Sequence, residues 1–250
     1  MPVSEMAVIR ESRAMEPYGF SLILDAPGIA AAAVPGQFVH VDCGGDTLLR
    51  RPFGVCGVDG MQVRLCYELK GRGTELLTRV RAGDLLPVMG PLGRGFDLSG
   101  ERILLVGGGM GTAPLLFAAG RSKYADAILG YRSADQELLS EDYKKVCGTV
   151  ELCTDDGTLG EHAFPDALVR RRLEREAYDR VLICGPNAMM KAVAKVCKEA
   201  GAPYQVSLDV RMGCGVGACL VCACRDSAGH YRRVCRDGPV FDGEEMDWDD

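Results

Sequence analysis

The stretch RILLVGGGMGTAP, residues 102–114, decides the fold class of this chain. A short apolar run leads into a glycine-rich turn, and Pro114 suits the first turn of a following helix. A strand, a glycine turn and a helix in succession are typical of a βαβ unit. The apolar residues 103–120 nearly reach the length of a membrane span, but the glycines and Pro114 favour strand, turn and helix over a span.

The same rhythm continues through residues 99–207. Short apolar runs predict strands, and longer polar and apolar mixtures between them predict helices. The expected strands are 102–106, 127–131, 149–153 and 180–184, and the expected helices begin at Pro114 or cover 166–175 and 187–200. Gly201 is well placed to end the last helix. Alternating strands and helices predict a doubly wound α/β domain with a parallel sheet.

Residues 1–98 have a different pattern. Residues 61–69 alternate between polar and apolar side chains, with Val63, Leu65, Tyr67 and Leu69 on one face, and turn-forming pairs such as Pro35-Gly36 interrupt the region. Short alternating strands predict an antiparallel β-barrel. Residues 208–250 show little regular pattern. The predicted fold is therefore an α+β multi-domain chain: a barrel domain (1–98), an α/β domain (99–207) and a cysteine-rich segment (208–250).

Charge and cysteine content narrow the function. The chain has 29 Lys and Arg against 35 Asp and Glu, and this acidic balance disfavours a nucleic-acid binder. The N-terminal residues carry no apolar signal segment, so we expect a cytoplasmic protein with no membrane association. The chain has 12 cysteines. In a reducing compartment, clustered cysteines point to metal or redox chemistry.

Cys214, Cys219, Cys222 and Cys235 are spaced C-x4-C-x2-C…C. This is the plant-type ferredoxin pattern for a [2Fe–2S] cluster. The intervening glycines let the chain bend around the cluster and leave backbone N–H groups free to bond its sulfurs. A structural zinc site is the alternative, but it usually needs two C-x2-C pairs, and Cys219 with Cys222 is the pair seen here. Cys224 is an extra thiol within the motif, either a buried small residue or a substitute ligand.

Two further pairs of segments indicate nucleotide binding. The glycine loop 107–111 lies at a predicted helix N-terminus, which favours a diphosphate, and CGP at 184–186 ends a predicted strand where α/β sheets bind ligands. A packing turn is the alternative for each. In the barrel half, RRPFG at 50–54 and KGRGT at 70–74 combine basic residues with glycine. They suit a flavin diphosphate or, equally, a charged hairpin.

Together these motifs resemble the ferredoxin reductase-like flavoproteins. The barrel motifs, GPLG at 90–93, the glycine loop and CGP all match that superfamily. The tail, RMGCGVGAC at 211–219 followed by Cys222 and VCRDGPVF at 234–241, resembles the electron-transfer subunits of class B, NAD-dependent dihydroorotate dehydrogenases. The resemblance covers nearly the whole chain, and the cysteine tail is its most specific part.

The resemblance implies three cofactors and their residues. FAD would contact Arg51, Pro52, Phe53, Gly54, Cys66, Tyr67, Glu68, Gly73 and Thr74. NAD would lie near Gly107, Gly108, Gly109, Gly111, Cys184, Gly185 and Pro186, and the [2Fe–2S] cluster would be ligated by Cys214, Cys219, Cys222 and Cys235. Gly54 departs from the family, which usually carries Ser or Thr there, close to the reactive edge of the flavin.

The implied function is electron transfer in pyrimidine (UMP) biosynthesis. A separate FMN-containing catalytic subunit would oxidise dihydroorotate, in a heterotetramer with two copies of each subunit, and electrons would pass through the cluster and FAD to NAD+. No residue of this chain is expected to act as a catalytic acid, base or nucleophile, and His40, His162 and His230 are expected to be structural or exposed. The rivals are a related NAD(P)H–ferredoxin or sulfide oxidoreductase subunit and a zinc-stapled nucleotide-binding regulator.

Overall fold

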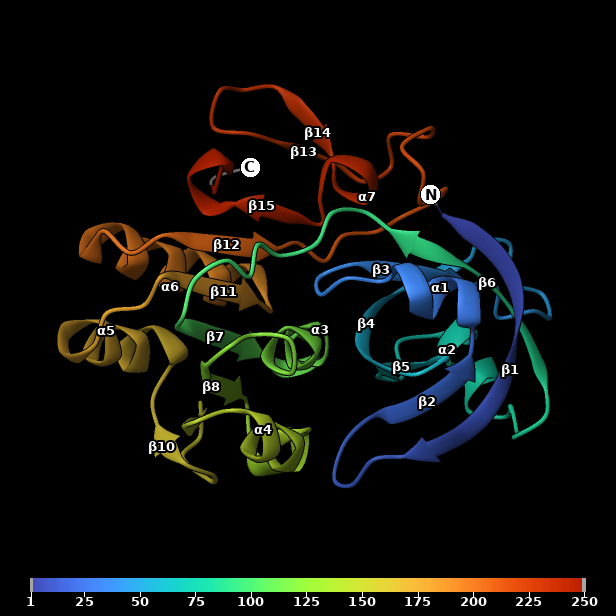
Figure 1. Cartoon of the computed structure of the whole chain (residues 1–250), viewed down its shortest axis with the longest axis horizontal. Coiled ribbons are helices and arrows are strands. Elements are labelled where there is room, and N and C mark those ends of the chain that lie inside the picture. Colours follow the sequence, from blue (N-terminus) through green and yellow to red (C-terminus); the bar gives the residue numbers. More distant parts are fainter. Residues whose placement is uncertain (1, 249–250) are drawn as a thin grey trace.

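The computed structural model describes residues 2–248, so Asp249 and Asp250 of the cysteine-rich segment lie outside the described residues. A β-barrel lies beside a layered α/β sheet, and the C-terminal segment lies across the two (Figure 1). This arrangement confirms the predicted fold class.

Six strands form the barrel. They are β1 (Val3–Ala14), β2 (Phe20–Asp25), β3 (Phe38–Val41), β4 (Arg51–Asp59), β5 (Gln62–Tyr67) and β6 (Leu85–Leu92), with α1 (Pro27–Ala32) and α2 (Arg72–Leu77) in the connections. They close in the order β1-β2-β5-β4-β3-β6, and each neighbouring pair is antiparallel. In β5 the predicted face is buried at Val63, Leu65 and Tyr67, but Leu69 lies beyond the strand and is exposed.

The second layer is a seven-stranded sheet in the order β10-β9-β8-β7-β11-β12-β15. Its strands are β7 (Ile103–Gly108), β8 (Ala125–Tyr131), β9 (Val150–Thr154), β10 (Glu161–His162), β11 (Arg180–Cys184), β12 (Tyr204–Ser207) and β15 (Val240–Asp242). All pairs are parallel except β12 with β15. The four predicted strands are all present, whereas β10, β12 and β15 were not predicted.

Helices cover both faces of this sheet, as a doubly wound domain requires. They are α3 (Thr112–Ala119), α4 (Ser140–Val146), α5 (Pro165–Arg175) and α6 (Asn187–Ala200), with 3-10 turns η1 (Gly109–Gly111), η2 (Ala134–Gln136) and η3 (Gly243–Glu245). Alternate residues of β7 face opposite sides because side chains of a strand alternate. Ile103 and Leu105 pack with α3 and α4, and Leu104 and Val106 pack with α5 and α6.

The C-terminal segment has more regular structure than its sequence predicts. β13 (Ala223–Arg225) and β14 (Tyr231–Arg233) form a small hairpin, α7 (Val234–Asp237) follows, and β15 joins the sheet edge antiparallel to β12. Short strands give almost no periodic signal, and the partner of β15 lies far away in the sequence. Cys222, Cys235 and Phe241 share a buried core with the sheet and with Phe38 of the barrel.

Residues 103–120 form β7, η1 and α3, as the sequence predicts. Among residues 2–248, no helix combines the length and the apolar character that crossing a membrane demands.

Candidate functional site

The glycine loop lies where the order of the parallel strands reverses. β7 pairs with β8 on one side and with β11 on the other, and Gly107 is the register partner of Cys184. Ligands of open α/β sheets bind at such a reversal, beyond the carboxyl ends of the strands. The fold therefore brings together the two segments predicted for NAD, residues 107–111 and 184–186.

Two glycines of the loop pack closely against residues 184–189. A Cβ atom on Gly111 would lie 2.4 Å from the carbonyl oxygen of Cys184, and one on Gly108 would lie 2.4 Å from Sδ of Met189. The hydroxyl of Thr112 donates to the Gly109 carbonyl at 2.8 Å, and α3 begins there, two residues before the predicted start at Pro114. The glycines leave backbone N–H groups near a helix start, an arrangement that suits a diphosphate.

The two basic segments of the barrel also meet. A Cβ atom on Gly73 would lie 2.7 Å from Nε of Arg51, so the Arg51 side chain lies against Gly73. The Thr74 hydroxyl accepts hydrogen bonds from the backbone N–H of Lys70 at 2.9 Å and of Gly71 at 3.2 Å. Thr74 therefore stabilises this turn. Arg51 places a positive charge beside Gly73, where the backbone has no side chain to block a ligand.

Aromatic side chains line the neighbouring part of the barrel. The Tyr67 ring stacks on Phe20 at a centroid distance of 5.4 Å and lies 5.6 Å from Phe53. Within the described part of the chain, the buried Tyr67 hydroxyl has no hydrogen-bond partner, and burial raises the pKa of Tyr67 to about 12. A buried unpaired hydroxyl needs an acceptor or donor from outside the protein. Aromatic rings, a free hydroxyl and Arg51 fit the mixed apolar and anionic character of FAD.

Other residues predicted for FAD are engaged with protein partners. Glu68 accepts a hydrogen bond from Tyr18 and forms an ion pair with Lys70 at 2.7 Å. Burial alone would raise the pKa of Glu68, but the contacts with Lys70 and Tyr18 outweigh it, so the pKa is lowered. The Sγ atoms of Cys66 and Cys56 lie 3.5 Å apart in a buried pair. These residues shape the barrel side of the site.

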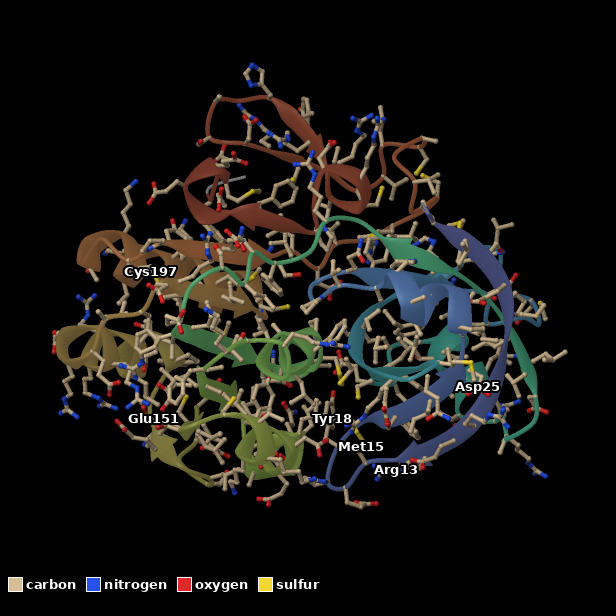
Figure 2. All side chains as sticks on the ribbon, viewed as in Figure 1. Arg13, Met15, Tyr18, Asp25, Glu151 and Cys197 are labelled. Carbon is tan, nitrogen blue, oxygen red and sulfur yellow. The ribbon has the colours of Figure 1, made fainter. Side chains whose placement is uncertain are left out.

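The barrel meets the α/β layer at Gly54. A Cβ atom on Gly54 would lie 3.0 Å from Cβ of Pro114, in the first turn of α3. Met15 and Tyr18, in the β1–β2 connection, lie on the side of the barrel that faces α4 (Figure 2). The segment predicted for FAD thus lies directly against the helix that follows the segment predicted for NAD.

The predicted cluster ligands are gathered by the cluster loop, which we define as residues 213–222, and by α7. Backbone N–H groups point at their sulfurs. Val216 and Ala218 donate to Sγ of Cys214 at 3.4 and 3.2 Å, and Gly217 donates to Sγ of Cys235 at 3.1 Å. Sulfur atoms that accept several N–H groups are suited to the thiolate state, and such bonds also stabilise an iron–sulfur cluster.

The four thiols associate in two pairs. The backbone N–H of Cys214 donates to Sγ of Cys219 at 3.4 Å, and that of Cys235 donates to Sγ of Cys222 at 3.5 Å. Burial opposes ionisation of Cys214, but the N–H groups outweigh it and lower its pKa to about 6. Burial and the neighbouring Cys222 thiol raise the pKa of Cys235 to about 12.

This pairing suits a two-iron cluster. A [2Fe–2S] cluster takes two protein ligands on each iron, so its four cysteines form two separated pairs. Tetrahedral zinc needs four ligands around one point.

Sequence analysis overlooked one contact of the cluster loop. His40, expected to be structural or exposed, is fully buried in β3, and its ring lies against Gly215. A periodic pattern cannot pair two residues so far apart in the sequence.

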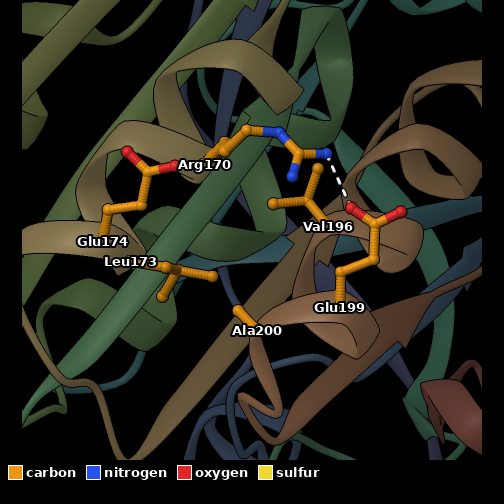
Figure 3. Close-up of a pocket in the computed structure, with 6 residues that line it drawn as sticks. All are labelled: Arg170, Leu173, Glu174, Val196, Glu199 and Ala200. Atoms are coloured by element: carbon orange, nitrogen blue, oxygen red, sulfur yellow. Dashed lines mark hydrogen bonds and ion pairs between the residues drawn. The ribbon is translucent and has the colours of Figure 1, made fainter.

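A hollow of about 280 Å³ between α5 and α6 contains none of the predicted site residues (Figure 3). It is lined by Arg170, Leu173, Glu174, Val196, Glu199 and Ala200.

Comparison with known proteins identifies the family of this chain. Residues 209–247 match the family model described as the iron-sulfur cluster binding domain of dihydroorotate dehydrogenase B. The electron transfer subunit of dihydroorotate dehydrogenase B (NAD+) from Caldanaerobacter subterraneus is 39% identical, over 85% of this chain and 86% of its own. That from Bacillus caldolyticus is 36% identical, over 97% and 98%. The chain belongs to this family of electron transfer subunits.

Solved structures support the family's fold over the whole chain. A structure of NADH-dependent reduced ferredoxin-NADP oxidoreductase, described for flavin-based electron bifurcation, has a TM-score of 0.86 and 29% identity, covering 98% of this chain and 91% of that one. A ferredoxin reductase of carbazole 1,9a-dioxygenase has a TM-score of 0.68 at 20% identity, covering 81% and 67%, which shows the fold alone.

Membership of the dihydroorotate dehydrogenase B family confirms the predicted activity, an oxidoreductase subunit that transfers electrons. It also confirms the predicted set of cofactors, FAD, a [2Fe–2S] cluster and NAD. The individual residues assigned to each cofactor remain predictions.

Proposed function

We propose that this chain passes electrons from an FMN-containing dihydroorotate dehydrogenase catalytic subunit to NAD+, through a [2Fe–2S] cluster and FAD, in pyrimidine biosynthesis. The family name of the relatives, an electron transfer subunit, supports a catalytic partner. We propose two copies of each subunit in the assembly. We also place it in the cytoplasm, because four cluster thiolates require reduced cysteines.

The cofactors divide the chemistry among them. NAD exchanges a hydride, an iron–sulfur cluster exchanges single electrons, and a flavin can do both, which is why a flavin must connect the other two. The chain's own residues hold and orient these groups.

We assign the residues as the sequence predicts. FAD is held by Arg51, Pro52, Phe53, Gly54, Cys66, Tyr67, Glu68, Gly73 and Thr74, of which Arg51 provides charge beside Gly73 and Phe53 and Tyr67 provide aromatic surface. NAD is held by Gly107, Gly108, Gly109, Gly111, Cys184, Gly185 and Pro186. The cluster is held by Cys214, Cys219, Cys222 and Cys235.

One observation carries the proposal: the three predicted sites adjoin one another. Gly54 of the flavin segment lies against Pro114, directly after the dinucleotide loop. Gly215 of the cluster loop lies against His40, on the barrel strand next to the one that carries Gly54. Electron transfer between bound cofactors requires their binding sites to lie close together, whereas unrelated binding sites would have no reason to adjoin.

The test is to purify the chain without oxygen and to analyse it for iron, acid-labile sulfide and flavin. We expect equal amounts of iron and sulfide, one FAD for each chain, and bleaching of the flavin absorbance when NADH is added. A colourless protein with stoichiometric zinc, or a flavin that NADH leaves oxidised, would contradict the proposal.

The partner is tested separately, by co-purification from the native cell. We expect an FMN-containing dihydroorotate dehydrogenase catalytic subunit in equal amount. A related NAD(P)H–ferredoxin oxidoreductase is the second candidate, because the solved chain with TM-score 0.86 is described as a ferredoxin-NADP oxidoreductase. Recovery of a ferredoxin-linked subunit instead would favour that candidate.

A further inference from the structure

His40 faces outward from the barrel, toward the cysteine-rich segment. Side chains alternate along β3, so Val39 and Val41 point into the barrel core while Phe38 and His40 point the other way. Phe38 belongs to the core shared with Cys222 and Cys235. Its ring meets that of His40 edge to face at a centroid distance of 5.8 Å.

The cluster loop lies directly on the His40 ring. A Cβ atom on Gly215 would lie 2.8 Å from both Cε1 and Nδ1 of His40. Gly215 also has φ of +72°, a left-handed conformation that glycine adopts without strain. Gly215 follows Cys214 directly, and the next two backbone N–H groups point at Cys214 and Cys235. The imidazole therefore supports the loop at the point where it turns around the sulfurs.

The imidazole has an unfulfilled hydrogen-bonding requirement. His40 is fully buried, and neither ring nitrogen finds a hydrogen-bond partner among residues 2–248. The buried Nη1 of Arg50 is likewise unpaired there. Burial, with the charge of Arg50, lowers the pKa of His40 to about 4. Whether neutral or charged, the imidazole ring carries at least one N–H. Buried donors without acceptors are rare and costly, so the His40 N–H calls for an acceptor from outside the chain, such as a water or a bound group.

We propose that His40 is a positioning residue of the iron–sulfur centre, which fixes the cluster loop against the barrel and donates its N–H to the sulfur-rich surface of the centre. This inference rests on the proposed function. Four thiolates make that surface anionic, and reduction adds a further negative charge. A donor bond stabilises the reduced state more than the oxidised state, so His40 raises the reduction potential of the centre.

The test compares three variants by redox titration of the purified protein, followed by electron paramagnetic resonance of the reduced centre. His40→Phe keeps a ring and removes the N–H. His40→Asn and His40→Gln place an amide N–H near Nδ1 and Nε2, respectively. We expect His40→Phe to shift the reduction equilibrium about tenfold toward the oxidised state, about 59 mV for one electron. We expect one of the two amide variants to restore the wild-type reduction potential. His162→Phe, at an exposed histidine of β10, is the control and should change nothing.

Each other result has a defined meaning. Loss of the centre in His40→Phe, with retention at the wild-type potential in one amide variant, also supports the inference. An unchanged potential in His40→Phe overturns it, as does a failure of both amide variants to improve on His40→Phe, because only packing would then matter. A wild-type protein without any paramagnetic signal after reduction contradicts the proposed function instead.

Discussion

Gly54 lies where the ferredoxin reductase-like flavoproteins usually carry Ser or Thr. Its neighbour in the α/β layer is Pro114, in the first turn of α3. A Cβ atom there would lie 3.0 Å from Cβ of Pro114, so any larger residue must displace that proline by a few tenths of an ångström. Two effects are therefore combined at one position. A hydroxyl could assist at the flavin edge, and a methyl-sized group would press on the start of α3.

The pair Gly54→Ser and Gly54→Ala separates these effects. Both variants add the Cβ atom, and Ser alone adds the hydroxyl. We expect the Ser variant to reduce its flavin with NADH several-fold faster than the Ala variant, because a hydroxyl near the reacting atoms stabilises developing charge. Stopped-flow absorbance measures both rates. Equal rates in Ser and Ala would show that the hydroxyl has no role here.

A second prediction concerns Cys222 and Cys224, which are two positions apart in the cysteine-rich segment. Cys222 is buried and receives the Cys235 N–H at 3.5 Å, whereas Cys224 belongs to β13 of the small hairpin. We expect Cys222→Ser to lose most of the paramagnetic signal and bound iron. Cys224→Ser is the matched control and should retain both. A full signal in Cys222→Ser would remove it from the ligand set.

The cysteine spacing can be read from the sequence and the contact of His40 with the cluster loop cannot, for a physical reason. Three of the four cysteines that we propose as ligands lie within nine residues, so the spacing itself indicates the bend of the loop. The contact of His40 with Gly215 exists only after the barrel and the tail have packed together. Local spacing can be read from a sequence, and a contact made by tertiary packing cannot.

The glycine loop shows the same contrast at the scale of elements. The apolar run and the glycines predicted β7, the turn and α3, because the periodicity is local. The partner of the loop, residues 184–186, could be expected only from where strands of an α/β sheet end. Edge strand β15 has three residues, too few for a periodic signal, and was missed. Elements with their own periodicity were found, and those formed by distant pairing were not.

Gly111→Ala tests whether the loop must pack this tightly on β11. The added Cβ atom would lie 2.4 Å from the Cys184 carbonyl oxygen. This oxygen belongs to the backbone, so relieving the clash requires a displacement of the chain itself. We expect a loss of about 1–3 kcal/mol in the free energy of unfolding and about a tenfold rise in the NADH dissociation constant. Urea denaturation and fluorescence titration measure the two effects.

Gly120→Ala, at the other end of α3, is the control for Gly111→Ala. Gly120 has a helical φ of −69°, and its Cβ atom would meet its nearest neighbour at 3.8 Å. We expect a change within about 0.5 kcal/mol and unaltered NADH binding. If Gly111→Ala behaved in the same way, the loop would not need glycine at that position.

At the scale of the whole molecule, an ion pair bridges the barrel and the α/β layer. Arg64 of β5 contacts Asp142 of α4 at 2.7 Å, and both side chains are about a quarter exposed. Asp142 also pairs with Lys145 of its own helix at 2.9 Å. The segments that we propose to bind FAD and NAD meet where the barrel contacts the α/β layer. A contact that fixes the relative position of the two layers would therefore also fix the distance between these segments.

Asp142→Asn removes both ion pairs, whereas Lys145→Met removes only the pair within α4. The difference between the two variants in free energy of unfolding therefore isolates the contribution of the ion pair with Arg64. Burial alone would raise the pKa of Asp142, but Lys145 and Arg64 outweigh it, so the folded pKa is lowered. A depressed pKa contributes stability above the unfolded value of about 3.9, and that contribution disappears as pH falls through the folded pKa. We expect the bridge to contribute about 1 kcal/mol to the free energy of unfolding between pH 5 and pH 8, and less below about pH 4. Urea denaturation across this range measures the difference. Equal stabilities of the two variants at pH 7 would mean that packing at Gly54 and Pro114, and not charge, holds the layers together.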